Sequence, residues 1–75
     1  MHYVTCQIKP TVYLQGLGYK AKRFAIACKD EDEQLAVAMN LSSMDGVSYV
    51  RLRSTKPYRR IILSAKDNYE KSLNL

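Results

Sequence analysis

Histidine, cysteine and serine are the residues with which a chain of this size would do nucleophilic chemistry, and here they are poorly placed for it. The only histidine among the 75 residues is His2. A serine or cysteine nucleophile needs a base within hydrogen-bond reach, and a histidine at the second position supplies none within a formed site. We therefore expect no catalytic residue and no enzyme activity.

Metal binding and disulfide formation are the other kinds of chemistry open to Cys6 and Cys28. A metal site with His2 and Asp32 is disfavoured, because the spacing matches no Cys-x-x-Cys motif and strands place ligands along a line. A disulfide between directly opposed strand residues would need strain, since their Cβ atoms lie about 4.5–5.5 Å apart and a disulfide requires ~3.8 Å. We expect two reduced thiols, no metal and no cofactor.

Two further motifs carry weak chemical signals. Gly16-Leu17-Gly18 is a G-x-G that falls between two expected strands rather than between a strand and a helix, so it predicts a turn and not a dinucleotide site. The acidic run 30–33 lacks the spacing of a calcium loop. Helix capping explains it without a ligand.

Binding chemistry is better represented, because basic and aromatic residues gather in two segments. One contains Tyr13, Tyr19, Lys20, Lys22 and Arg23, and the other is RLRSTKPYRR, residues 51–60, with Tyr49 just before it. Arginine forks suit phosphate groups and tyrosine rings can stack on bases. The expected contact residues are Lys20, Lys22, Arg23, Arg51, Arg53, Lys56, Arg59 and Arg60, with Tyr19, Tyr49 and Tyr58 as stacking groups.

Charge is unevenly distributed along the chain. Residues 1–29 carry five basic and no acidic residues, residues 30–45 carry five acidic and no basic residues, and residues 46–75 carry seven basic and two acidic residues. The formal net charge of +5 therefore combines basic strands with an acidic helix. The simplest interpretation of this charge distribution, without a binding partner, is a solvated sheet face whose charge aids solubility.

Apolar residues at even-numbered positions, with mostly polar residues between them, predict two long strands joined by a hairpin, with the even-numbered side chains such as Val4, Cys6, Phe24 and Ile26 on one buried face. The first covers residues 4–14 and the second covers residues 20–28, with the glycine turn at 16–18 between them. A three-residue loop would place Ile8 opposite Ile26, Cys6 opposite Cys28 and Pro10 opposite Phe24. Residues 10–24 would then project as a two-stranded arm.

A helix follows, with Asp30 as its N-cap and Glu33 in a capping box. Its end is expected at Asp45-Gly46, with Gly46 as the C-terminal cap. Its buried arc is expected to consist of the apolar residues Leu35, Val37, Ala38, Met39 and Leu41, with Asn40 and Ser43 on the opposite side.

Two more strands are predicted after the helix, at residues 47–53 and 58–64, joined by a turn at 55–57. Arg53 would then face Arg60 in one register or Arg59 in the other. Like charges in direct opposition destabilise a strand pair, so an anionic partner would relieve the cost. The tail from residue 66 to 75 is expected either to form a short helix capped by Asp67 or to fray.

These elements make a single small α+β domain over residues 1–75. The expected architecture is a two-layer β-β-α-β-β sandwich, with one helix on a four-stranded, mostly antiparallel sheet. A β-grasp-like sheet and a simple antiparallel meander both satisfy the pattern. A chain this short has one core and little room for a deep enzyme pocket.

No signal peptide and no apolar run of the ~18 residues needed to cross a bilayer is evident. We expect a cytoplasmic protein with no membrane partner, either a monomer or a homodimer joined at strand edges. The first function hypothesis is binding of nucleic acid or a nucleoprotein complex through the basic, tyrosine-containing sheet and hairpin surface. No motif supports sequence-specific readout.

The alternative hypothesis is a protein-binding module. It would be a small inhibitor or adaptor, of the kind that phages and mobile elements encode, that blocks a larger host factor. A free strand edge or a mixed charged surface would be its means of docking.

Overall fold

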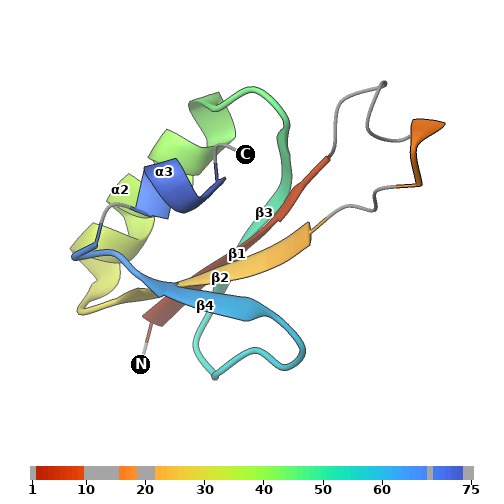
Figure 1. Ribbon diagram of the computed structural model, residues 1–75. Helices are drawn as coiled ribbons and strands as arrows, with labels where there is room; N and C mark the ends of the chain where they lie inside the picture. Colours follow the sequence, from red (N-terminus) through yellow and green to blue (C-terminus); the bar gives the residue numbers. More distant parts are fainter. Residues whose placement is uncertain (1, 10–15, 19–21, 68, 74–75) are drawn as a thin grey trace.

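The computed structural model describes residues 2–9, 16–18, 22–67 and 69–73. One sheet carries one main helix on a single face, so the α+β class is confirmed (Figure 1). The elements in chain order are β1 (His2–Ile8), β2 (Lys22–Cys28), α2 (Glu31–Ser43), β3 (Val47–Arg53), β4 (Ile61–Ser64) and α3 (Tyr69–Leu73).

The four strands lie in the order β3-β1-β2-β4. β1 is central and runs antiparallel to β2 and β3, whereas β2 and β4 run parallel. The sheet is therefore mixed. The antiparallel meander is wrong, because β3 pairs with β1 and not with the strand that precedes it.

The predicted register of the first two strands is wrong by an even number of residues. Val4 pairs with Ile26, Cys6 with Phe24 and Ile8 with Lys22. An even shift keeps every side chain on its predicted face, so alternation could not distinguish the two registers. The paired strands end at Ile8 and Lys22, so the connection between them is longer than a three-residue turn. Most of the predicted arm, at 10–15 and 19–21, lies outside the described residues.

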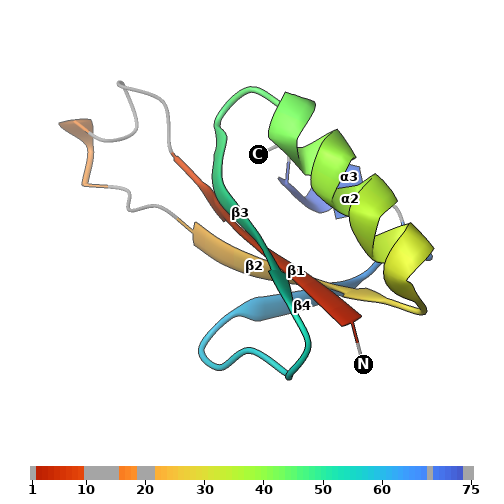
Figure 2. The ribbon, with the colours of Figure 1, turned by 180° about the vertical axis from the view of Figure 1, so that it is seen from behind.

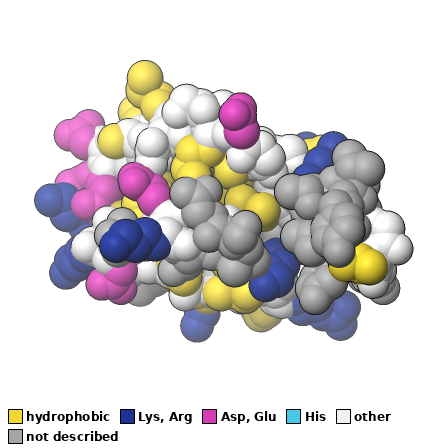
Figure 3. Space-filling view, turned by 45° about the horizontal axis from the view of Figure 1, so that its top comes forward, with side chains coloured by type: hydrophobic (Ala, Val, Ile, Leu, Met, Phe, Trp, Pro, Cys, Tyr) yellow, Lys and Arg dark blue, Asp and Glu magenta, His cyan; other side chains and the backbone are white. Residues whose placement is uncertain are grey.

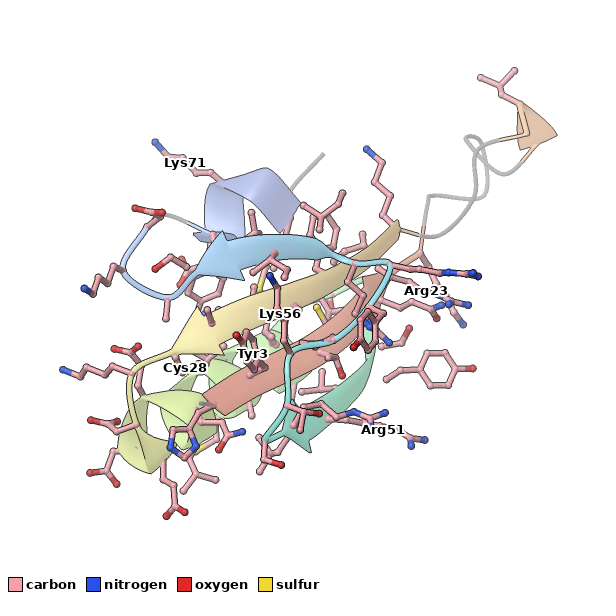
Figure 4. The ribbon with its side chains drawn as sticks, turned by 90° about the horizontal axis from the view of Figure 1, so that it is seen from below. Tyr3, Arg23, Cys28, Arg51, Lys56 and Lys71 are labelled. Atoms are coloured by element: carbon pink, nitrogen blue, oxygen red, sulfur yellow. The ribbon has the colours of Figure 1, made fainter. Side chains whose placement is uncertain are left out.

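The predicted hairpin between the last two strands is also wrong. β3 ends beside Tyr3, β4 begins beside Phe24, and the two strands lie at opposite edges of the sheet. Because they also run in the same direction, residues 54–60 must return across the sheet. They do so over the face that α2 leaves open (Figure 4). Arg53 therefore faces neither Arg59 nor Arg60 across a strand pair.

Helix α2 begins as its sequence predicts. Asp30 Oδ1 accepts a hydrogen bond from the Glu33 amide at 2.8 Å, and Glu33 Oε1 accepts one from the Lys29 amide at 2.9 Å. The helix ends earlier than predicted, with Met44 and not Gly46 as its cap residue. Gly46 supplies a φ of +84° to the turn that follows, where its carbonyl accepts from the Lys9 amide.

The buried stripe of α2 differs from the predicted arc. Gln34, Val37 and Leu41 are buried, whereas Leu35 and Met39 are 52% and 74% exposed. The short helix α3 accounts for this rotation. The core residues are Val4, Cys6, Phe24, Ile26, Val37, Leu41, Tyr69 and Leu73.

α3 packs against the side of α2 that was expected to face solvent. Asn40 Nδ2 donates to Tyr69 Oη at 3.0 Å and to Glu70 Oε1 at 2.8 Å. Tyr69 and Leu73 then complete the core on that flank. Of the two expectations for the tail, the short helix is confirmed. In the part of the chain that is described, no helix has the length and apolar character to span a membrane.

Gln34 is a buried polar residue that ties α2 to the sheet. Its Nε2 donates to the carbonyl oxygen of Tyr3 at 2.9 Å and to that of Arg53 at 3.1 Å. These acceptors belong to β1 and β3 where the two strands pair. The side chain therefore fixes the helix start over the β1·β3 end of the sheet.

Replacing Gln34 with methionine keeps the volume and removes both hydrogen bonds from a buried position. We expect Gln34→Met to lower the free energy of unfolding by about 1–3 kcal/mol, the usual effect of losing buried hydrogen bonds. Urea denaturation followed by circular dichroism measures this. Ala36→Met, at an exposed position of the same helix, is the control. Equal stability of the two variants would show that the bonds contribute nothing.

Candidate functional site

A groove of about 390 Å³ lies on the sheet face that α2 leaves open. Figure 4 looks onto this face and shows Arg23 and Arg51 extending from different strands toward the same end of the molecule. The residues that line the groove are Thr5, Gln7, Arg23, Tyr49, Arg51, Arg53 and Arg60.

Strand pairing explains why arginines from separate segments meet here. Thr5 pairs with Arg51 on β3, and Gln7 pairs with Arg23 on β2. Paired residues of neighbouring strands point to the same face of a sheet. β1 therefore forms the floor of the groove, and arginines rise from the strands on both of its sides.

Tyr49 reaches the groove because β3 contains a bulge. Thr5 pairs with Arg51 but Gln7 pairs with Ser48, so β3 has one residue more than β1 between these points. Tyr49 takes a φ of +56° there, an unusual and costly conformation for an aromatic residue. Tyr49 as a whole is 64% exposed. The bulge thus places an accessible aromatic side chain at the edge of the groove.

Arg60 is held in place by the backbone of the sheet. Its Nη1 donates to the carbonyl oxygens of Cys6 at 3.1 Å and Phe24 at 3.4 Å. Partial burial lowers its pKa from the ordinary value, and the positive charge of Arg23 lowers it further. Arginine nevertheless stays protonated at neutral pH. The site therefore contains a fixed cation among like charges.

A second hollow, of about 250 Å³, continues the groove under residues 54–60. Thr5, Arg53 and Arg60 line both hollows. The residues that it adds are Thr55, Lys56, Pro57 and Tyr58. Tyr58 is 91% exposed. We call the two hollows together the basic groove.

Acidic residues are placed elsewhere. No Asp or Glu is among the described residues that line the basic groove. Asp30–Glu33 stand at the start of α2, and Figure 3, which looks onto the helices, shows most acidic side chains at that end of the molecule. The mutual repulsion of the groove cations is therefore not offset by lining carboxylates, and a bound anion would offset it.

Most of the predicted contact residues come together in the basic groove. Those that line it are Arg23, Arg51, Arg53, Lys56, Arg60, Tyr49 and Tyr58. Lys22 and Arg59 are exposed but do not line it. Lys20 and Tyr19 lie outside the described residues.

Thr5 and Gln7 are groove residues that the sequence reasoning missed. Both occupy polar positions in the alternation of the first strand, so the same pattern that identified the buried face could have assigned them to the open face. Thr55 and Pro57 carried no such signal, because their position depends on the path of residues 54–60 across the sheet.

The cysteines are free thiols, and Cys6 pairs with Phe24 rather than with Cys28. Burial, with the nearby carboxylates of Glu33 and Asp30, raises the pKa of Cys28 to about 11. A thiol with so high a pKa is a poor nucleophile at neutral pH. The described residues include no group of three or more His, Cys, Asp or Glu side chains placed to hold a metal ion.

No protein-family model matches the chain, and neither the curated proteins nor the solved structures include a significant match to it.

Thr5 is only 1% exposed, and its hydroxyl oxygen has no hydrogen-bond partner among the described residues. Burying an unpaired hydroxyl is unfavourable. We therefore expect Thr5→Val, which replaces the hydroxyl with a methyl group, to raise stability by about 1 kcal/mol, or roughly 4–8 °C in Tm. Thr5→Ser, which keeps the hydroxyl and loses the methyl group, should lower Tm. A lower Tm for Thr5→Val would contradict the assignment of an unpaired hydroxyl.

Proposed function

We propose that this protein is a non-enzymatic nucleic-acid-binding protein whose basic groove receives the phosphates of the polymer. The observation that carries the proposal is the convergence of cations from three separate segments on a groove whose described lining residues include no carboxylate. These cations are Arg23, Arg51, Arg53, Lys56 and Arg60. A nucleoprotein complex presents the same phosphates and is an equally suitable target.

The chemistry of arginine suits this ligand. Each guanidinium offers planar N–H groups that match two phosphate oxygens at once. Nη1 of Arg60 already donates hydrogen bonds to two backbone carbonyls. The guanidinium is therefore held in a fixed position, with its other N–H groups available to a ligand. A preformed donor loses less conformational entropy on binding than a mobile one.

The exposed tyrosines favour single strands over duplexes. Tyr49 borders the groove at the bulge of β3 and Tyr58 borders it at residues 54–60. Their rings can stack on bases only where those bases are unpaired, and such stacking is tolerant of sequence. We expect binding with little sequence preference, because phosphate contacts carry no base information.

Salt dependence tests the phosphate contacts. If five cations contact phosphates, a plot of the logarithm of the association constant against the logarithm of the salt concentration should be linear. Its slope should be about −3 to −4 for single strands, or about −4 to −5 for duplexes. The double variant Arg51→Gln/Arg53→Gln should bind more weakly and lessen this slope by about 1–2. Fluorescence anisotropy with labelled oligonucleotides across a salt series measures both.

The matched control is Lys66→Gln/Lys71→Gln, which removes the same charge from exposed positions outside the groove. Lys71 lies at the opposite end of the molecule from Arg23 (Figure 4). This control should retain nearly the affinity and slope of the unaltered protein. Equal weakening in both variants would show that net charge, and not the groove, is responsible. Absence of salt-dependent binding would overturn the proposal itself.

Tyr58 tests the stacking contact. At 91% exposure its ring contributes little to the core, so Tyr58→Ala should leave the fold unchanged. We expect it to weaken binding to oligo(dT) roughly 5- to 150-fold, from the ~1–3 kcal/mol of one base–aromatic stack. Tyr58→Phe keeps the ring and should bind within about twofold of the original affinity. Equal affinity of the alanine and phenylalanine variants would exclude stacking at this position.

A further inference from the structure

An apolar hollow of about 440 Å³ lies on the other face of the molecule, between α2 and β3. Its lining residues are Leu35, Ala38, Met39, Ser42, Ser43, Val50 and Leu52. Leu35, Met39 and Leu52 are 52%, 74% and 49% exposed. Leu35 and Met39 were expected on the buried arc of the helix, so the hollow contains apolar surface that the fold itself does not bury.

The hollow borders a strand edge that is open to pairing. β3 is the outermost strand of the sheet and pairs only with β1 among the described residues. Figure 2 shows β3 in front at the sheet edge, with α2 alongside. The outward N–H and C=O groups of an edge strand are a template for another strand.

The two faces of this edge differ in chemistry. Val50 and Leu52 line the apolar hollow on the helix side, whereas Arg51 and Arg53 line the basic groove on the opposite side. A strand added beside β3 would place alternate residues against these two surfaces. Apolar residues suit the first surface and carboxylates suit the second.

We propose that β3 and the α2/β3 hollow bind an extended segment of another protein in which apolar residues alternate with Asp or Glu. The segment would add a fifth strand to the sheet. Its apolar side chains would cover Leu35, Met39 and Leu52, and its carboxylates would pair across the strand edge with Arg51 and Arg53. The apolar hollow lies on the helix side of the sheet, so contact with it does not require nucleic acid, although Arg51 and Arg53 are shared with the basic groove.

Charge argues for such a partner over a second copy of this chain. Antiparallel pairing of β3 with its own copy would bring Arg51 and Arg53 of both molecules together on one face, and like charges in opposition destabilise a strand pair. The net charge of +5 opposes self-association further. An acidic segment removes the repulsion instead of doubling it.

A short synthetic peptide with the sequence Glu-Val-Glu-Leu-Glu-Val-Glu, acetylated and amidated, is the probe. Titration into the isotopically labelled protein should shift the amide resonances of β3 and of the α2 residues that line the hollow. Two control peptides carry lysine in place of glutamate, or the same residues in an order that does not alternate. Both should bind at least tenfold more weakly.

Met39→Lys places a charge in the hollow at a position that is 74% exposed, so the fold should tolerate it. We expect this variant to bind the acidic peptide at least tenfold more weakly. Ala36→Lys, on the exposed surface of the same helix but outside the hollow, should bind it normally. Both variants should keep the affinity of the unaltered protein for oligo(dT), so failure here is distinguishable from failure of the proposed function.

Three results would overturn the proposal. The first is the absence of resonance shifts in β3 and α2 at millimolar peptide. The second is equal affinity for the alternating and non-alternating peptides, which would indicate attraction by charge alone. The third is a dimer in sedimentation analysis that Met39→Lys dissociates, which would assign the hollow to a second copy of the chain.

Discussion

The parallel pairing of β4 with β2 is the constraint on which the open face depends. β3 and β4 lie at opposite edges of the sheet and run in the same direction. Residues 54–60 must therefore cross the sheet from the end of β3 to the start of β4. Arg60 completes this crossing by donating to the carbonyls of Cys6 and Phe24, one on each central strand. If residues 54–60 formed a hairpin instead, the Cys6 and Phe24 carbonyls would lack the Arg60 donor, and these residues would not cover the open face of the sheet.

The separation of charge follows from the two-layer architecture. The acidic run that begins α2 is stabilised by the positive end of the helix, and the helix occupies only one face of the sheet. The arginines of β2 and β3 then point to the other face because side chains alternate along a strand. A modest net charge of +5 is thereby divided into an acidic helix start and a basic groove.

The sequence allowed the buried faces of the first two strands to be predicted, but not their register, the buried face of α2 or the path of the chain. Alternation assigned Val4, Cys6, Phe24 and Ile26 to the core, and all four are buried there. It could not fix pairing, since a shift of two residues preserves every face. The rotation of α2 and the crossing at 54–60 depend on where α3 and β4 pack. The sequence predicted both elements, but their positions are set by tertiary contacts that no local pattern records. Five of the eight predicted cations therefore line one groove, but the geometry that brings them together is not the predicted hairpin.

The two proposed surfaces share Arg51 and Arg53, and this makes them thermodynamically coupled. Both side chains line the basic groove and also stand on the edge strand beside which a partner segment would lie. Phosphates that neutralise these cations would weaken their attraction for the carboxylates of that segment, and linkage requires the reverse effect to be equal. An acidic strand on β3 would thus favour release of nucleic acid. If both proposals hold, a protein segment bound beside β3 and a nucleic acid bound in the basic groove would compete, because both partners interact with Arg51 and Arg53 of the same strand.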